Sequence, residues 1–273
     1  ELVGRYQATL EGFSDNTLVR FQIRVQNDES GNRFWPHPQS LKPAFSFFVT
    51  EYQSKGLIPH VLVINPSGIE RAKRKYDIKA SILTPEPTRG NSVFIFFQTG
   101  SNIPQVRDFV RVGRRTRGYK IRFRSRELFQ RMSTLNLLDE GKPRFALSEF
   151  LSYELFRMAG VPTPYADHYR LRMDQEWKGC QLVVEQPNKA FLRRNGRSTK
   201  GNLYKLLWYG RNFIQQHEKK TNLDSGHDDI IQVVQALGRL SGDQEWRYIR
   251  QHFNVEEFAA FYAVNQCISN WGG

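Results

Sequence analysis

The stretch that decides the fold is residues 165–205, YADHYRLRMDQEWKGCQLVVEQPNKAFLRRNGRSTKGNLYK. Its pattern predicts, in order, a strand, a turn, a second strand, a loop and a third strand. The second strand delivers Glu185 directly after apolar residues, and the third carries Lys205. A charge at the end of an apolar strand costs free energy unless it is paired or used. Two such charges of opposite sign predict a pre-arranged polar site.

Outward from this stretch, strands are predicted before it and helices on both sides of it. The strands lie at 60–66, 77–84, 92–98 and 119–125, with a short helix at 67–76, and longer helices at 144–160, 227–242, 243–253 and 254–271. Asp228 and Asn254 are the expected N-caps of two helices, and Glu257 stands three residues after Asn254 as in a capping box. Strands followed by a hairpin and then mostly helices are typical of the α+β class.

Residues 1–52 are predicted to be all-β. Apolar and polar residues alternate over 18–28, which indicates a half-buried antiparallel strand, with 6–13 and 44–50 as its neighbours. Three strands are too few for a closed sandwich, so this segment is interpreted as the end of an antiparallel β-sandwich module. A second domain is expected over 57–273. Glu1 is not a natural start and no signal peptide is visible, which indicates a fragment or a processed form.

Composition bounds the class of partner. Hydrophobic residues make up 39% of the 273, which is enough to bury a core. The sequence contains no run of about eighteen apolar residues, so it predicts no membrane span. The net charge of +13, partly concentrated in 107–131, favours an acidic partner such as nucleic acid, a nucleotide, an anionic surface or an acidic protein. The alternative is a soluble domain with an arginine-rich surface. Cys180 and Cys267 are expected to be buried free thiols.

Common catalytic signatures are absent from the sequence. There is no GxxxxGK[ST], GxGxxG, HExxH, GxSxG, HRD or DFG. What remains is a constellation of Arg117, Lys120, Glu185 and Lys205. A strand lysine paired with a glutamate is the arrangement that kinases use to hold phosphates. In the alternative interpretation the cations lie on solvated strand faces and Glu185 caps a turn.

Three segments carry a resemblance to a known family. They are RRTRGYKIRF (114–123), the run from 147 to 192 that includes LVVEQ, and GNLYK (201–205). Together they resemble the spore-coat CotH kinase family, with a hairpin turn placed at Trp177-Lys178-Gly179. HEKKTN (217–222) and VNQCISNW (264–271) are similar to family segments too. The resemblance covers roughly residues 57–273.

The resemblance implies an atypical protein-kinase-like domain, preceded by part of a sandwich. Such kinases are secreted or lie at the cell surface, and use ATP with Mg²⁺ or Mn²⁺ to phosphorylate Ser/Thr of protein partners, Ser-rich ones included. By position, Arg117 and Lys120 would face the phosphates. Glu185 would pair with that cation or orient the metal, and Lys205 would touch the nucleotide. Secondary nucleotide-binding candidates follow from the same comparison: Lys219, Lys220 and Asn270.

One departure from the family pattern concerns the acids. The family's catalytic Asp is expected at or after Gly272, but Asn270-Trp271 is followed by Gly272-Gly273. No catalytic residue and no metal ligand is therefore identified, and the kinase domain is expected to be impaired, or to lack its C-terminal part. Two alternatives stay open: a pseudokinase or surface adhesion module, and nucleic-acid binding through 107–131. The sequence has no RRM, KH or helix-turn-helix signature to support nucleic-acid binding, so nucleic acid is not the expected partner.

Overall fold

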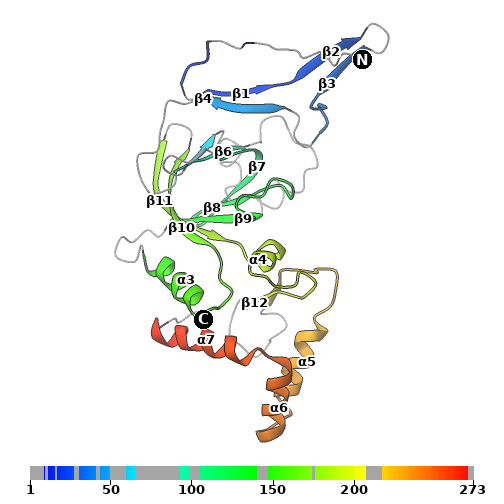
Figure 1. Cartoon of the computed structure of the whole chain (residues 1–273), viewed down its shortest axis with the longest axis vertical. Coiled ribbons are helices and arrows are strands. Elements are labelled where there is room, and N and C mark those ends of the chain that lie inside the picture. The colour runs from blue at the N-terminus through cyan, green and yellow to red at the C-terminus, as the bar shows by residue number, and fades with distance from the viewer. Residues whose placement is uncertain are drawn as a thin grey trace. The chain divides into compact units, whose positions relative to one another are not determined.

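A computed structural model gives the fold of the chain (Figure 1). It describes residues 9, 12–15, 17–27, 31–40, 44–49, 60–64, 93–98, 105–139, 147–173, 176–206 and 217–269. Helices and mainly antiparallel strands are mixed along the chain, as the α+β class requires. The chain divides into two compact units, residues 1–114 with 169–180, and residues 115–168 with 181–273.

The start of the first unit consists of two strand pairs. Strand β1 (Thr17–Phe21) pairs antiparallel with β4 (Phe45–Val49), and β2 (Ile23–Asn27) with β3 (Gly31–Trp35). The single strand expected over 18–28 is therefore two strands with different partners. Aromatic rings pack within the first pair, with the centroids of Phe21 and Phe45 5.4 Å apart.

The rest of the first unit carries further strands. Strand β5 (His60–Ile64) pairs antiparallel with β6 (Val93–Gln98), and β6 pairs with β7 (Gln105–Arg115). Strand β5 also pairs in parallel with the end of β10 (Ala166–Met173). The strands expected near 60–66 and 92–98 are confirmed, whereas the helix expected at 67–76 and the strand at 77–84 lie outside the described residues.

The second unit is built on three antiparallel strands. Strand β8 (Gly118–Arg122) pairs with β9 (Thr134–Leu138), which pairs with the end of β11 (Glu176–Glu185). Both faces of this sheet carry buried side chains: Ile121 and Leu135 are fully buried on one face, and Leu182 is fully buried on the other. Gly118 has φ +114°, and a Cβ there would lie 1.9 Å from the carbonyl oxygen of Leu137. Only glycine fits at this start of β8.

Two expectations for the 165–205 stretch are wrong. The turn placed at Trp177-Lys178-Gly179 lies inside β11, where Gly179 takes a positive φ of +82°. The expected loop after β11 contains a short helix, α4 (Lys189–Arg194). Asn188 caps it, because its Oδ1 accepts hydrogen bonds from the backbone N–H groups of residues 190 and 191. Burial of Ala190 and Phe191 fixes this one-and-a-half-turn helix against the strands.

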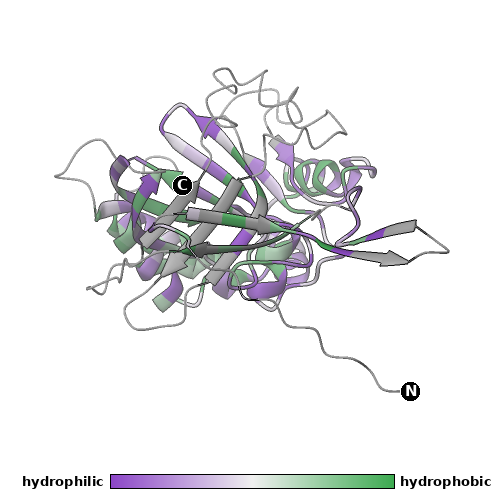
Figure 2. Ribbon diagram, turned by 90° about the horizontal axis from the view of Figure 1, so that it is seen from above, coloured by the Kyte–Doolittle hydropathy of each residue, from purple (hydrophilic) through white to green (hydrophobic). Residues whose placement is uncertain are grey.

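Helices dominate the remainder of the second unit. They are α3 (Ser148–Met158), α5 (Asp228–Leu237), α6 (Gly242–His252) and α7 (Val255–Cys267), and a short hairpin of β12 (Tyr204–Leu206) and β13 (His217–Lys219) precedes α5. The rings of Phe156 and Phe261 stack at 5.4 Å, which joins α3 to α7. Figure 2 shows that the helices carry both hydrophobic and hydrophilic residues.

The helix caps and the cysteines test smaller expectations. Asn254 is confirmed as an N-cap, because its Oδ1 accepts from the N–H of Glu257 at 3.2 Å. Asp228 is not a cap; it is the first residue of α5, and His227 precedes it. Both cysteines are present as thiols and both are exposed, so the expected burial is wrong. Among the described residues no helix has the length and apolarity to cross a bilayer.

Candidate functional site

The strand register of the second unit separates Lys120 from Glu185. Ile121 lies opposite Leu135, which lies opposite Glu185, so these three side chains share one face of the sheet. All three are buried, with Glu185 only 1% exposed. Lys120 is one residue away along β8, and successive side chains of a strand point to opposite faces. Lys120 and Glu185 therefore serve two different environments.

On the buried face, Glu185 forms an ion pair with Arg194 of α4. Its Oε2 accepts from Nε of Arg194 at 2.8 Å, from Nη2 at 2.5 Å, and from the backbone N–H of Tyr165 at 3.1 Å. Nη2 of Arg194 also donates to the carbonyl of Thr163 at 2.7 Å. The other oxygen, Oε1, is buried without a hydrogen-bond partner among the described residues. This pair ties the end of β11 to α4 and to the segment before β10.

The resemblance implied a different partner for Glu185. The cation near Arg117 or Lys120 was expected to pair with it, but Arg194 occupies that role. The sheet pleat is the physical reason, since it turns Lys120 to the other face. Arg117 lies exposed in the turn between β7 and β8. Within the described residues, no hydrogen bond or ion pair joins Arg117 to Glu185.

On the opposite face, Lys120 lies among polar and basic side chains. Its Nζ donates to Oε1 of Gln186 at 3.2 Å. Nearby, Nη1 of Arg115 donates to Oδ1 of Asn136 at 2.9 Å. Burial lowers the pKa of Lys120 to about 8, and the positive charges of Arg122, Arg115 and Lys220 act in the same direction. An ammonium in such surroundings gains by acquiring an anion.

The β12–β13 hairpin brings two more lysines into reach of Lys120. Lys205 lies directly opposite Glu218 in the register, and Glu218 forms an ion pair with Lys220. The hydrogen bond from Lys220 lowers the pKa of Glu218, and the charges of Lys220, Lys205 and Lys120 contribute to the lowering. We call Lys120, Lys205 and Lys220, gathered around Glu218, the lysine cluster. Glu218 was missed in the sequence because only pairing with Lys205 gives it a role.

Lys219 is structurally distinct from its neighbour Lys220. It is buried, and its Nζ donates to the carbonyl oxygens of Ser225 at 2.9 Å and Gly226 at 2.7 Å, and to the hydroxyl of Ser225. Its Nζ also lies 5.8 Å from the centre of the Tyr204 ring. Strand alternation turns Lys219 away from the face that carries Glu218. Lys219 therefore holds the loop before α5, while Lys220 belongs to the lysine cluster.

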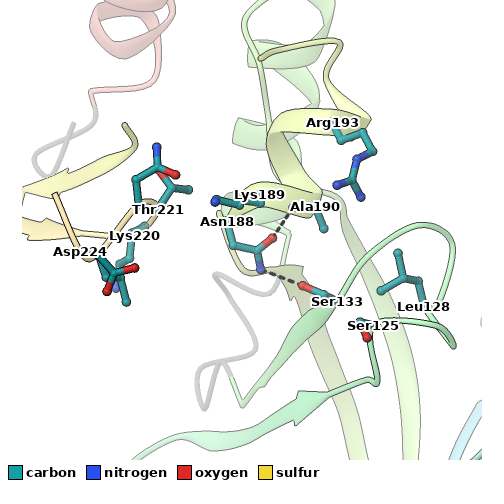
Figure 3. Close-up of a pocket in the computed structure, with 12 residues that line it drawn as sticks. Ser125, Leu128, Ser133, Asn188, Lys189, Ala190, Arg193, Lys220, Thr221 and Asp224 are labelled. Atoms are coloured by element: carbon teal, nitrogen blue, oxygen red, sulfur yellow. Dashed lines mark hydrogen bonds between the residues drawn. The ribbon is translucent and has the colours of Figure 1, made fainter. Parts of the chain in front are cut away.

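An open groove of about 550 Å³ begins at Lys220 (Figure 3). In the figure Lys220, Thr221 and Asp224 lie on one side, and α4 with Lys189 and Arg193 on the other. Its full lining is Ser125, Leu128, Ser133, Asn188, Lys189, Ala190, Arg193, Lys220, Thr221, Asn222, Leu223 and Asp224. The volume falls within the range of small-ligand sites, about 300–1,000 Å³. The groove adjoins the lysine cluster through Lys220.

Metal-binding acids do not gather in the part of the chain that the structure describes. No group of three or more His, Cys, Asp or Glu side chains there could hold an ion. The nearest acid to the lysine cluster, Glu218, is engaged by lysines. Asn270 and the position expected for the catalytic Asp, at or after Gly272, lie outside the described residues.

The second unit is a mixed α+β unit in which clustered lysines lie beside a ligand-sized groove. Comparison with known families is more specific. The model of the family described as CotH kinase protein matches residues 109–272, more than half of the chain. The chain belongs to the CotH kinase family. The match includes the whole lysine cluster and the groove, and residues 1–108 lie outside it. No curated protein matches the chain.

Proposed function

We propose that this chain is an ATP-dependent protein kinase domain that transfers the γ-phosphate to Ser or Thr of a protein partner. The observation that carries the proposal is the lysine cluster beside the groove, inside the segment that matches the CotH kinase family. Phosphoryl transfer requires positioning and charge stabilisation more than covalent chemistry from the protein. A group of ammonium ions supplies both.

The charges of the lysine cluster suit the phosphates of a nucleotide. Three lysines surround a single carboxylate, so the cluster keeps a net positive charge below about pH 8, where Lys120 is protonated. Arg115 and Arg122 add to the positive potential at Lys120. Cations in reach of one another, two of them (Lys120 and Lys220) partly buried, attract a polyvalent anion more strongly than isolated surface lysines do.

The groove provides room for the rest of the nucleotide. We infer that the nucleoside occupies it while the phosphates extend toward Lys220. Asn188, at the start of α4, lines the groove and donates to the hydroxyl of Ser133 at 3.0 Å. This bond links α4 to the residue before β9, so the lining is fixed before a ligand arrives. A pre-formed site lowers the entropic cost of binding.

Glu185 has a positioning role in this proposal. It holds Arg194 at the far end of α4, and Gln186 is the next residue after it and Asn188 the third. Gln186 contacts Lys120 and Asn188 lines the groove. The buried ion pair therefore fixes the segment that carries both contacts. The phosphate contact predicted for Arg117 stays a prediction.

The family implies a divalent metal, which would neutralise phosphate charge and orient the nucleotide. The acids in the described residues do not fit such an ion, because Glu218 stands alone among lysines. We therefore assign no step to the metal. The predicted catalytic carboxylate, at or after Gly272, stays a prediction.

The test compares the chain with Lys120→Met/Lys205→Met, using Lys178→Met as the matched control. Lys178 is also a strand lysine beside an acid, with its Nζ 2.7 Å from Glu176, but it lies outside the lysine cluster. We expect the double variant to bind ATP at least about tenfold more weakly by calorimetry, at two contacts of about 1 kcal/mol each, and the control to bind normally.

Transfer is measured with radiolabelled ATP, Mg²⁺ or Mn²⁺ and a Ser-rich protein. Binding with no transfer under any metal would support the pseudokinase alternative. Binding of nucleic acid that falls steeply with salt, without ATP binding, would support the role of 107–131 instead. If the chain binds neither ATP nor nucleic acid, the surface adhesion module remains as the alternative.

The family is associated with the spore coat, and we propose a secreted or cell-surface location for this chain. The proposal rests on family membership. Immunolabelling of intact cells or spores that make the protein, before and after permeabilisation, tests it. Signal that requires permeabilisation would contradict a surface location.

A further inference from the structure

Glu218 is an acid placed inside a site that we propose to bind anions. We propose that Glu218 is an internal counter-anion, which competes with phosphate for the lysine cluster and so sets the affinity of this kinase for its nucleotide. The inference rests on the proposed function, because it deepens the role of the same lysines.

The hairpin register fixes the position of Glu218. It lies directly opposite Lys205 on β12, and it forms an ion pair with Lys220, two residues further along the chain. Lys120 reaches the same carboxylate electrostatically from β8. One carboxylate therefore pairs with Lys220, lies opposite Lys205 and acts electrostatically on Lys120.

The exposure of Glu218 argues against a structural role. Its side chain is 53% exposed, whereas that of Lys220 is 18% exposed. The hairpin is anchored on its other face, where buried Lys219 binds the loop at residues 225–226. Tyr204 adds a hydrogen bond to Asp229 at 2.6 Å on that side. Since these contacts hold β12 and β13 without Glu218, the acid is free to be displaced.

Competition follows from the charges. Exposed ion pairs are weak, so a carboxylate in this position yields to a multiply charged phosphate. Each lysine released from Glu218 becomes available to the ligand. Removing the carboxylate charge should raise anion affinity by about two- to fivefold, the worth of an exposed ion pair. The carboxylate would thus keep the lysine cluster ordered when the site is empty and keep nucleotide binding reversible.

The experiment measures binding of inorganic pyrophosphate by calorimetry at low salt without metal, for the full chain and for Glu218→Gln. Pyrophosphate carries no base or sugar, so it reports the phosphate site alone. Glu176→Gln is the matched control, because Glu176 is an exposed strand acid paired with a lysine, Lys178, outside the cluster. Circular dichroism checks that each variant folds.

We expect Glu218→Gln to bind pyrophosphate about two- to fivefold more tightly than the parent, and Glu176→Gln to match the parent. Equal or weaker binding by Glu218→Gln would overturn the inference, as would an equal gain in both variants, which would show a net-charge effect only. If the parent binds pyrophosphate and ATP but Glu218→Gln changes nothing, only this inference fails. If no variant binds either anion, the proposed function fails with it.

Discussion

The two faces of the β8–β9–β11 sheet treat charge in opposite ways. On the buried face, Glu185 is sealed at 1% exposure and bound to Arg194 and the Tyr165 amide. On the other face, where Asn136 and Val184 are buried too, half-buried Lys120 shares its surroundings with other cations and with an acid that is half exposed. A buried, paired charge fixes structure, whereas a partly exposed, crowded charge remains available to a ligand. The comparison separates the roles of Glu185 and Lys120, which the sequence alone assigns to one site.

Removing the charge of Glu185 should have the largest effect on stability. Glu185→Gln leaves Arg194 with a partly buried charge and no counter-ion, which costs about 3 kcal/mol of unfolding free energy. For a chain of this size that corresponds to a fall in melting temperature of roughly 6–12 °C. Thermal unfolding of the full chain measures it.

Glu176→Gln is the control for this prediction, since its salt bridge to Lys178 is exposed and should contribute below about 1 kcal/mol. Adding Arg194→Met to Glu185→Gln should recover part of the loss, because the unpaired cation is removed as well. Unchanged melting in Glu185→Gln would contradict the structural role of the buried pair.

Lys219, at the end of β13, and Lys220, the next residue, provide a second test of the same comparison. Lys219→Met leaves three acceptors of the loop at 225–226 without their donor, and we expect a loss of about 2 kcal/mol. Lys220→Met removes one surface ion pair and should cost below about 1 kcal/mol. Urea unfolding of both variants tests the difference. Equal losses would mean that the two sides of β13 are not distinguished as the structure indicates.

Several elements of this fold are predictable from the sequence because their signals are local. The alternation in 119–125 predicts β8, with Ile121 and Phe123 buried and Arg122 exposed. The capping residues of α7 predict its start. Helix α4 was missed because six residues cannot show a helical period, and its cap, Asn188, resembles an ordinary turn residue.

The candidate site is harder to predict, because it depends on register. The sequence indicates that Lys120, Lys205 and Glu185 are unusual, but only pairing with β9 assigns Lys120 and Glu185 to opposite faces. Glu218 acquires its role through its place opposite Lys205, thirteen positions earlier in the chain. Lys219 and Lys220 are neighbours of the same type in the sequence, but Lys219 ends β13 with its side chain buried and Lys220, the next residue, pairs with Glu218. Long-range pairing is what local pattern cannot supply.

The smallest effect that we predict concerns pH, and it tests whether the lysine cluster binds anions through Lys120. The ordinary lysine pKa of 10.5 is lowered to about 8 here by burial and by Arg122, Arg115 and Lys220, with Glu218 opposing. Lys120 is therefore charged below about pH 8 and neutral above it. Pyrophosphate affinity of the parent, taken relative to that of Lys120→Met at each pH so that the ionisation of pyrophosphate itself cancels, should fall about fivefold between about pH 7 and pH 9, the loss of one contact of about 1 kcal/mol.

Lys120→Met should lack this fall, because the titrating lysine is gone. Stability should change in the opposite direction. Between about pH 8 and 10.5 the unfolded chain binds a proton at Lys120 that the folded chain has lost, so this group makes folding more favourable as pH rises. A parent profile that runs parallel to that of Lys120→Met would contradict the assignment of the titrating group to Lys120.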